Sequence, residues 1–274
     1  MNIAGKTKIT GLFGYPVEHT LSPAMHNAAF EHLGMDYCYV PFLVHPHFIR
    51  EAVGAVRALN MVGVNVTIPH KESVIALLDS VDEEAVFIGA VNTIVHREGR
   101  LAGYNTDGRG FMRSLAENHI PVAGKTILVI GAGGASKAIS YYLSEKAEKL
   151  YLYDIDKNKL EKLVSDLMKI RKNVSALDQL ARLNDFEIII NATPLGLKSE
   201  DPSPFDVSGL MPDQTVCDLI YRRTPLLQKA SLRGCRTMDG LGMLLWQGAL
   251  AFELWTGVPP PVEVMKNALL MSFR

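Results

Sequence analysis

The chain has 274 residues, 48% of them hydrophobic and 21% charged, and its formal net charge is −1. This length suits two domains, and the composition excludes disordered, collagen-like and coiled-coil proteins. A near-neutral charge gives no basic footprint for nucleic acid or an anionic membrane surface. No apolar run approaches the ~18 residues of a membrane span. We therefore expect a small-molecule substrate as the partner, with no nucleic acid and no membrane.

Charged residues are unevenly distributed along the chain. Residues 1–106 carry seven Lys and Arg against ten Asp and Glu, whereas residues 107–274 carry 21 against 19. All eight histidines lie in the first 119 residues. Lys71 is the single lysine between Lys8 and Lys125, although lysines that only solvate a surface usually have lysine neighbours. This isolation marks Lys71 as a candidate functional residue, the alternative being an isolated surface lysine.

The three cysteines, Cys38, Cys217 and Cys235, are scattered and show no metal-ligand spacing. An odd, scattered set is typical of reduced thiols in a cytoplasmic protein. His26 and His70 also lack partners at ligand spacing, so we expect no metal site. The sequence leaves the oligomeric state open between monomer and homodimer.

The first part of the chain alternates between short β-rich runs and helical patterns. Ser22 is predicted to cap a helix over 23–33, with Pro23 as its first residue. The alternation predicts βαβ units and a mostly parallel sheet. Strands are predicted over 9–13, 37–42 and 63–68, helices over 47–59 and 75–78, and a hairpin over 90–95 and 100–103.

A second series of elements follows a helix predicted over 108–118. The segment 194–212 has no periodic pattern and is predicted as a loop. Two final helices, over 241–255 and 262–272, are expected to return to the first domain. Further strands are predicted over 125–130, 149–153, 187–191 and 214–218, with helices over 134–144 and 157–170.

These elements predict an α/β protein of two domains with a cleft between them. The first, residues 1–106 plus 243–274, is a discontinuous, mostly parallel α/β domain for substrate binding and catalysis. The second, residues 107–242, is a Rossmann-type doubly wound domain for NAD(P).

A glycine turn follows the strand predicted over 126–130 and precedes a helix. Glycine lets the backbone turn tightly and approach a pyrophosphate, whose charge is met by the N-terminal amides of the helix. Ser136 stands where the dinucleotide fingerprint has Gly or Ala, so the match is imperfect. The alternative is a glycine-rich turn without a ligand. The cofactor residues assigned to this turn are Gly131, Ala132, Gly133, Gly134 and Ala135.

Asp154 ends the next predicted strand, 23 residues after the first glycine of the turn. An acid at this place accepts hydrogen bonds from ribose hydroxyls and repels a 2′-phosphate. Alternatively it caps the following helix, a role that Asp156 could also serve. Lys157 or Lys159 could instead counter a 2′-phosphate. We expect NAD(P) as cofactor, with NAD favoured by Asp154 and NADP left open.

Two further residues are candidates for chemistry. Lys71 follows a predicted strand at its carboxyl end, where α/β sheets bind ligands, and lysine is suited to proton transfer. Asp107, in Thr-Asp-Gly before a helix, is read from the residues alone either as a helix cap or as a functional carboxylate.

The chain resembles the shikimate dehydrogenases in six motifs spread from residue 14 to about 257. They are HTLSPAMHN at 19–27, NVTIPHK at 65–71, GAVNT at 89–93, NTDG at 105–108, GAGGAS at 131–136 and DGLGM at 239–243 with Gln247. The resemblance implies NAD(P)-linked interconversion of 3-dehydroshikimate and shikimate, a step toward chorismate and aromatic amino acids. Lys71 and Asp107 are the implied catalytic pair.

The resemblance also implies the remaining site residues. Thr20 and Ser22 would address the substrate carboxylate, and Tyr221 would lie near the substrate. Read without the resemblance, Met243 is ordinary helix packing and Gln247 an amide satisfied by local backbone. The residues implied for the ring hydroxyls are Asn65, Thr67, Asn92 and Gln247, and those implied near the nicotinamide are Leu219, Gly240 and Met243.

Two departures from the family pattern bear on specificity. Thr20 replaces the usual serine, and its added methyl narrows the pocket beside the carboxylate and disfavours quinate. Asp154-Ile155-Asp156 replaces the Asn-Arg of NADP-using relatives, so the guanidinium that would hold a phosphate is missing. The alternatives are a quinate or dual quinate/shikimate dehydrogenase and, from another class, a non-catalytic dinucleotide-binding regulatory protein.

Overall fold

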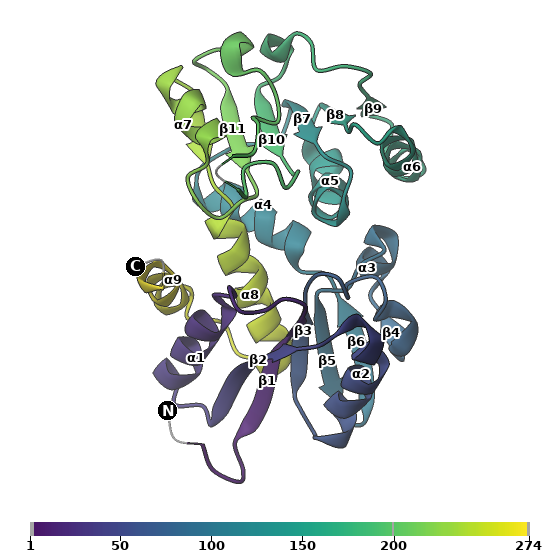
Figure 1. Ribbon diagram of the computed structural model, residues 1–274, viewed down its shortest axis with the longest axis vertical. Helices are drawn as coiled ribbons and strands as arrows, with labels where there is room; N and C mark the ends of the chain where they lie inside the picture. The colour runs from purple at the N-terminus through teal and green to yellow at the C-terminus, as the bar shows by residue number, and fades with distance from the viewer. Residues whose placement is uncertain (1–2, 199, 273–274) are drawn as a thin grey trace. The chain divides into compact units, whose positions relative to one another are not determined.

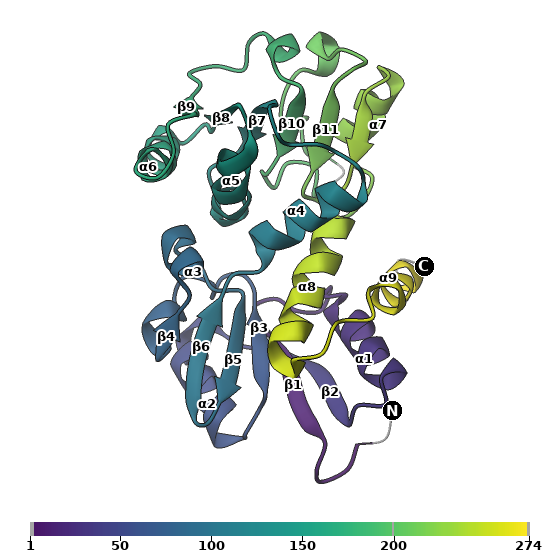
Figure 2. The ribbon, with the colours of Figure 1, turned by 180° about the vertical axis from the view of Figure 1, so that it is seen from behind.

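Two units of α/β structure make up the part of the chain that the computed structural model describes, residues 3–198 and 200–272 (Figures 1 and 2). The first unit comprises Met1–Thr106 and Leu245–Arg274, and the second comprises Asp107–Leu244. Helix α8 (Leu241–Thr256) therefore begins in the second unit and ends in the first. Within the described residues, no helix is long and apolar enough to cross a membrane.

The first unit is built on a six-stranded sheet. Its strands are β1 (Lys8–Gly14), β2 (Tyr37–Leu43), β3 (Gly63–Val66), β4 (Ser80–Val81), β5 (Thr93–Arg97) and β6 (Arg100–Tyr104). They lie in the order β2-β1-β3-β5-β6-β4. The pairs β2–β1, β1–β3 and β4–β6 are parallel, and β5 runs antiparallel to both neighbours. The predicted hairpin, β5 with β6, is confirmed and accounts for one of the two antiparallel pairs.

Helices cover this sheet and close its core. They are α1 (Ser22–His32), α2 (Ile49–Ala58), α3 (Glu83–Ile88), α8, α9 (Val262–Met271) and the short 3₁₀ turns η1 (Pro46–Phe48) and η2 (Ile75–Leu77). Helix α9 packs beside α1, as both ribbon views show. Burial of apolar side chains such as Val53, Val64 and Leu101 supplies the main stabilisation of this unit.

The prediction that Ser22 caps the first helix is wrong. Helix α1 begins at Ser22, and Leu21 occupies the cap position without a side-chain cap hydrogen bond. The Thr20 hydroxyl accepts a hydrogen bond of 3.3 Å from the Ser22 backbone N–H. Ser22 is itself buried within the unit.

The second unit contains a fully parallel sheet. Its strands are β7 (Thr126–Ile130), β8 (Lys149–Tyr153), β9 (Val174–Ala176), β10 (Ile188–Asn191), β11 (Thr215–Asp218) and β12 (Arg236–Met238). They lie in the order β12-β11-β10-β7-β8-β9, so the direction of winding reverses between β7 and β10. Doubly wound sheets bind ligands at this reversal, outside the carboxyl ends of the strands. The predicted Rossmann-type fold is confirmed.

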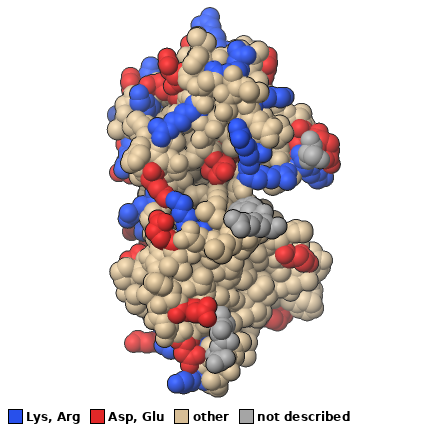
Figure 3. Space-filling model, turned by 90° about the vertical axis from the view of Figure 1, so that its left-hand side faces the viewer, with Lys and Arg blue, Asp and Glu red and all other residues tan. Residues whose placement is uncertain are grey.

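Helices of the second unit connect these strands. They are α4 (Asp107–Glu117), α5 (Gly134–Lys146), α6 (Lys157–Met168), α7 (Pro225–Leu232) and the 3₁₀ turns η3 (Leu183–Asp185) and η4 (Val207–Gly209). Figure 3 shows Lys and Arg gathered on the part of its face that this unit forms, as the uneven charge of the sequence indicates.

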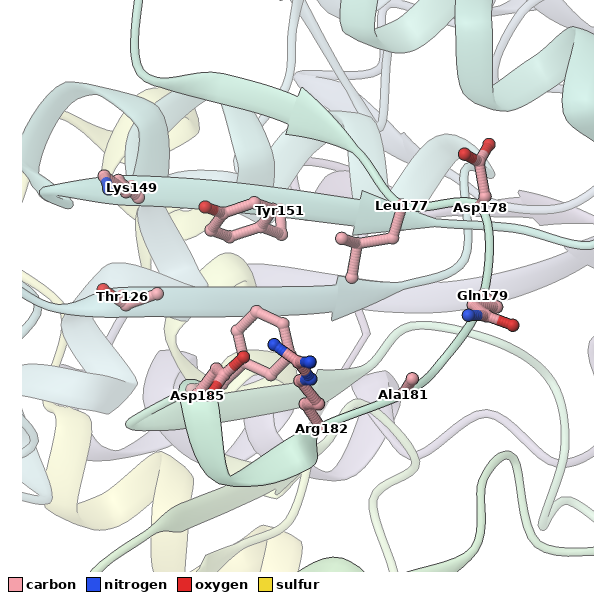
Figure 4. A pocket seen from close by; sticks show the side chains of 10 residues that line it. Thr126, Lys149, Tyr151, Leu177, Asp178, Gln179, Ala181, Arg182 and Asp185 are labelled. Atoms are coloured by element: carbon pink, nitrogen blue, oxygen red, sulfur yellow. The ribbon is translucent and has the colours of Figure 1, made fainter.

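A cavity of about 620 Å³ lies against the sheet of the second unit (Figure 4). Tyr151 and Phe186 contribute aromatic rings to it, and Lys149 and Arg182 contribute cationic side chains. The segment 177–186, which links β9 to β10 without an α-helix, forms one side. None of the predicted site residues lines this cavity.

Candidate active site

The segments that follow β1 and β3 lie side by side, because these strands are parallel neighbours. The Thr67 N–H donates to the Phe13 carbonyl oxygen at 2.9 Å, and the Tyr15 N–H donates to the Ile68 carbonyl oxygen at 3.0 Å. The first segment carries the predicted substrate residues 20 and 22, and the second carries residues 67 and 71. The parallel register therefore brings two sequence motifs to one edge of the sheet.

Lys71 is partly buried, and its backbone is tied to the segment that precedes β5. The Val91 N–H donates to the Lys71 carbonyl oxygen at 2.8 Å. The next residue, Asn92, accepts from the Val66 N–H through its own carbonyl oxygen, also at 2.8 Å. The first of these bonds ties the backbone at Lys71 to Val91, the residue that precedes the predicted substrate residue Asn92.

A buried network of polar side chains lies behind this edge. Asn65 accepts a hydrogen bond of 2.9 Å from the Tyr39 hydroxyl, and its amide donates to the Asn92 carbonyl oxygen and the Thr93 hydroxyl at 3.2 and 3.1 Å. The Asn92 side-chain oxygen accepts from the Thr93 hydroxyl and the Thr106 N–H, both at 2.9 Å. The structure thus joins Asn65 and Asn92 within the first unit.

The other substrate candidates differ in burial. Ser22 is buried, whereas Thr20, Thr67 and Gln247 are partly buried. Tyr221, in the second unit, is 40% exposed.

Asp107 is the first residue of α4 and is 8% exposed. It directly follows Thr106, whose hydroxyl accepts a hydrogen bond of 2.9 Å from the Asn92 amide. The segment that leads into Asp107 is therefore held by the same network that orients Asn92.

His26 and His70 both contact other residues of the first unit. The His70 ring pairs through Nε2 with the Val44 carbonyl oxygen at 2.7 Å. The fully buried His26 ring stacks on the Tyr39 ring, with the centroids 4.4 Å apart. Burial lowers the pKa of His26 to about 3, which keeps the ring neutral at physiological pH. Among the described residues, no group of three or more metal-binding side chains forms a metal site.

The glycine turn of the second unit links β7 to α5. Gly131 has a φ of +111°, and a Cβ at this position would lie 2.9 Å from the Ala192 carbonyl oxygen, so the turn requires glycine. A Cβ at Gly133 or Gly134 would meet nothing within 4 Å, which leaves this side of the turn open. Gly133 occupies the cap position of α5 and makes no side-chain cap hydrogen bond, so it leaves the first amides of the helix to other partners. The turn fits a bound pyrophosphate.

The departure at Ser136 is accommodated by burial. Its side chain is fully buried on α5, and its hydroxyl has no hydrogen-bond partner within the described residues. Ser136 therefore lies on the buried side of α5.

Asp154 belongs to the turn rather than to the next helix. Its carboxylate accepts hydrogen bonds from the Ala132 N–H at 2.6 Å and the Asp156 N–H at 2.7 Å. Asp156 caps α6 by accepting from the Lys159 N–H at 3.2 Å. The capping role that the sequence left open for Asp154 therefore belongs to Asp156.

The lysines that could counter a 2′-phosphate have other partners. The Lys157 ammonium donates to the Asp178 carbonyl oxygen at 3.0 Å and lies 5.4 Å from the centre of the Tyr153 ring. The Lys159 ammonium forms an ion pair of 3.3 Å with Asp156.

Leu219 and Gly240 are brought together beyond the ends of β11 and β12. The Gly240 N–H donates to the Ile220 carbonyl oxygen at 3.0 Å, and any Cβ on Gly240 would clash with the Leu219 carbonyl group. Met243 is almost fully buried on α8.

A buried carboxylate that the sequence analysis missed holds this loop. Asp218 accepts from the Asn191 amide at 3.0 Å, the Thr224 hydroxyl at 2.7 Å and the Ile220 N–H at 3.1 Å. Burial raises the pKa of Asp218, and these hydrogen bonds oppose that rise. Its signal was an acid that ends a buried strand, the same signal that marked Asp154.

A parallel sheet with a glycine turn at its reversal and an acid at the end of the neighbouring strand defines a doubly wound dinucleotide-binding unit. With its second α/β unit, the chain belongs to the class of two-unit α/β proteins built on this fold. Family models match it as "Shikimate dehydrogenase substrate binding domain" over residues 12–94, "Shikimate / quinate 5-dehydrogenase" over 114–196 and "Shikimate 5'-dehydrogenase C-terminal domain" over 240–270.

Individual relatives agree with the family models. The chain is 46% identical to a shikimate dehydrogenase (NADP(+)) of Desulforamulus reducens, over 97% of this chain and 96% of that protein. Its structure resembles that of shikimate 5-dehydrogenase from Listeria monocytogenes in complex with shikimate and NAD, with a TM-score of 0.91, 35% identity and 97% and 98% of the two chains covered. Quinate dehydrogenase from Corynebacterium glutamicum in complex with NAD gives a TM-score of 0.90 at 32% identity, over 97% and 99% of the chains. The chain belongs to the shikimate dehydrogenase family.

Proposed function

We propose that the chain reversibly reduces 3-dehydroshikimate to shikimate with NAD(P), as an oxidoreductase acting on a CH–OH group in the route to chorismate and aromatic amino acids. The observation that carries this proposal is the buried network of Asn65 and Asn92, to which the segment of Lys71 is tied. A polyhydroxylated ring needs neutral donors and acceptors in fixed orientations, because an unpaired buried polar group is costly. Membership of the family supports the same reaction.

Substrate binding is assigned to polar side chains of the predicted motifs and to Tyr221. Thr20 and Ser22 donate hydroxyl hydrogen bonds to the substrate carboxylate, and Tyr221 contacts the substrate. Hydroxyl and amide groups suit these tasks because they can be fully paired without an added charge. The residues assigned to the ring hydroxyls are Asn65, Thr67, Asn92 and Gln247.

The chemistry requires a hydride and a proton to reach the same carbonyl group. The dinucleotide, when bound, supplies the hydride to the carbonyl carbon. The Lys71 ammonium donates a proton to the carbonyl oxygen, which becomes the hydroxyl of shikimate, and Lys71 accepts that proton in the reverse direction. Asp107 accepts a hydrogen bond from a neighbouring ring hydroxyl and so fixes the ring for transfer.

For the cofactor, we propose a preference for NAD over NADP. The Asp154 carboxylate is held at the glycine turn, where it can accept from ribose hydroxyls and repel a 2′-phosphate. The relative from Desulforamulus reducens is named for NADP(+), so this preference would separate the chain from it. The residues assigned to the cofactor are Gly131, Ala132, Gly133, Gly134, Ala135, Asp154, Leu219, Gly240 and Met243.

Thr20 supports shikimate rather than quinate as the substrate, because its methyl group reduces the room beside the carboxylate. The test is steady-state kinetics with shikimate and with quinate, each with NAD and NADP, followed by nicotinamide absorbance. We expect the highest kcat/KM with shikimate and NAD. Comparable kcat/KM with quinate would contradict the substrate assignment, and binding of cofactor without any turnover would indicate a non-catalytic dinucleotide-binding protein.

We further propose a cytoplasmic location, supported by three buried cysteines that are free thiols. All assigned residues come from one chain, so a monomer and a homodimer would carry the same site.

A further inference from the structure

The Tyr39 side chain links α1 to β3 within the first unit. It is 2% exposed, and its hydroxyl lies 2.9 Å from the Asn65 side-chain oxygen. None of the six sequence motifs of the family resemblance includes Tyr39, and the reaction described above gives it no role.

The orientation of the Asn65 amide follows from its neighbours. One end of the Asn65 side-chain amide faces the Asn92 carbonyl oxygen. A carbonyl oxygen can only accept, so the Asn65 nitrogen must be the atom at that end. The Asn65 oxygen then faces Tyr39, and the Tyr39 hydroxyl must donate to it. The proton of Tyr39 is therefore committed to Asn65.

This orientation limits what Asn65 can offer to a ligand. Its two N–H groups donate to the Asn92 carbonyl oxygen and the Thr93 hydroxyl. Its oxygen accepts from Tyr39 and keeps one further lone pair. Asn65 can thus accept a hydrogen bond from a ring hydroxyl but has no N–H left to donate.

Helix α1 holds Tyr39 in place through two side chains. Asn27 forms two hydrogen bonds with the Tyr39 backbone, accepting from its N–H at 2.8 Å and donating to its carbonyl oxygen at 3.0 Å. His26 stacks on the ring with an interplanar angle of 9°. Burial raises the pKa of Tyr39, so its hydroxyl stays protonated. Tyr39 is therefore held against α1 with its hydroxyl at Asn65.

We propose that Tyr39 is a positioning residue for substrate binding, which holds Asn65 as an acceptor for a ring hydroxyl. This inference rests on the proposed function. Tyr39 itself need not touch the substrate, because its effect passes through Asn65.

The first test is Tyr39→Phe, with Tyr37→Phe as the matched control on the same strand. Tyr37 also packs its ring beneath α1, on Phe30, with the centroids 5.0 Å apart. Loss of one buried hydrogen bond to Asn65 should raise the KM for shikimate about five- to ten-fold, with kcat and the KM for the dinucleotide changed less than about two-fold. Tyr37→Phe should leave all three constants unchanged.

The outcomes separate this inference from the proposed function. No wild-type turnover of shikimate would overturn both. Wild-type turnover with an unchanged KM in Tyr39→Phe, or an equal fall in kcat and in cofactor affinity, would overturn the inference alone.

A second measurement does not depend on activity. Tyr39→Phe and Asn65→Ala, singly and together, form a double-mutant cycle in the free energy of unfolding. We expect a clear coupling, with the second substitution destabilising the protein less when the first is present. Strictly additive losses would show that the hydroxyl does not hold Asn65 and would overturn the inference.

Discussion

The carboxylate of Asp154 accepts a hydrogen bond of 2.6 Å from the backbone N–H of Ala132, in the middle of the glycine turn. Ala132 and Asp154 are 22 residues apart in the sequence, and this bond joins them in the structure. The bond fixes the carboxylate at the turn, and an acid at this place in dinucleotide-binding folds accepts hydrogen bonds from ribose hydroxyls. Cofactor preference should therefore depend on this side chain.

Asp154→Ala should lower kcat/KM with NAD about 10- to 100-fold, because charged hydrogen bonds to the ribose are lost. With NADP, kcat/KM should fall less or rise, since the repulsion of the 2′-phosphate is removed. The control is Asp206→Ala, which removes the carboxylate that caps the 3₁₀ turn η4 and should leave the cofactor ratio unchanged. An unchanged NAD/NADP ratio in Asp154→Ala would contradict the assignment.

A close approach of backbones makes Gly63 a sensitive position. A Cβ there would clash with the Ile94 carbonyl oxygen and lie 2.5 Å from the Trp255 indole nitrogen, which donates to that oxygen at 3.0 Å. Gly63→Ala should destabilise the protein by about 1–3 kcal/mol in urea unfolding. Gly54, exposed on α2 with nothing near its Cβ position, is the matched control. Gly54→Ala should stabilise by about 0.5–1 kcal/mol, and equal effects at both sites would refute the packing argument.

His26 should make the stability of the first unit depend on pH. In the unfolded chain its pKa is near 6.5, whereas burial lowers the folded-state pKa to about 3. Above pH 6.5 both states are neutral and this residue contributes no pH dependence. Between pH 6.5 and 3 the unfolded state binds a proton that the folded state does not. Lowering the pH through this range therefore reduces the free energy of unfolding by at most about 1.4 kcal/mol per pH unit.

The corresponding measurement compares the wild type with His26→Leu, which keeps a buried side chain of similar size. Lowering the pH from 7 to 5 should reduce the free energy of unfolding less in the variant than in the wild type, because the variant lacks the proton that unfolded His26 binds. Urea unfolding at both pH values measures this difference. At pH 7 the variant should be at least as stable, because neither imidazole nitrogen of His26 has a partner among the described residues. The same pH slope in both proteins would show that His26 does not titrate as described.

Local patterns in the sequence predicted much of the fold. The glycine turn, the hairpin of β5 and β6 and the long helices all have strong local signals. Helix α7 and strands β9 and β12 were not predicted, because segments of eight and three residues are too short to show a period. The cap of α1 was misassigned because the helix begins one residue earlier than predicted, at Ser22 itself, and a sequence pattern does not fix a helix boundary to one residue.

The residues of the candidate site also fall into two groups, those that local sequence patterns could predict and those that they could not. Motif residues such as Asn65 and Asp154 could be named from the sequence, because each follows or ends a strand in a recognisable setting. Tyr39 could not be, since its contact with Asn65 joins positions 26 residues apart through side chains alone. Hydrogen-bond direction at Asn65 also depends on which groups surround it, and periodicity carries no information about that.

The most direct test of the account is the rate of 3-dehydroshikimate reduction by wild type, Lys71→Ala and Lys71→Arg, each at saturating cofactor. Loss of the proton donor should lower kcat about 10²- to 10⁴-fold in Lys71→Ala, while the dissociation constant of shikimate changes only a few-fold. Lys71→Arg should be similarly slow, because a guanidinium keeps the charge but does not give up its proton. Turnover by Lys71→Ala within a few-fold of the wild type would contradict the role of Lys71.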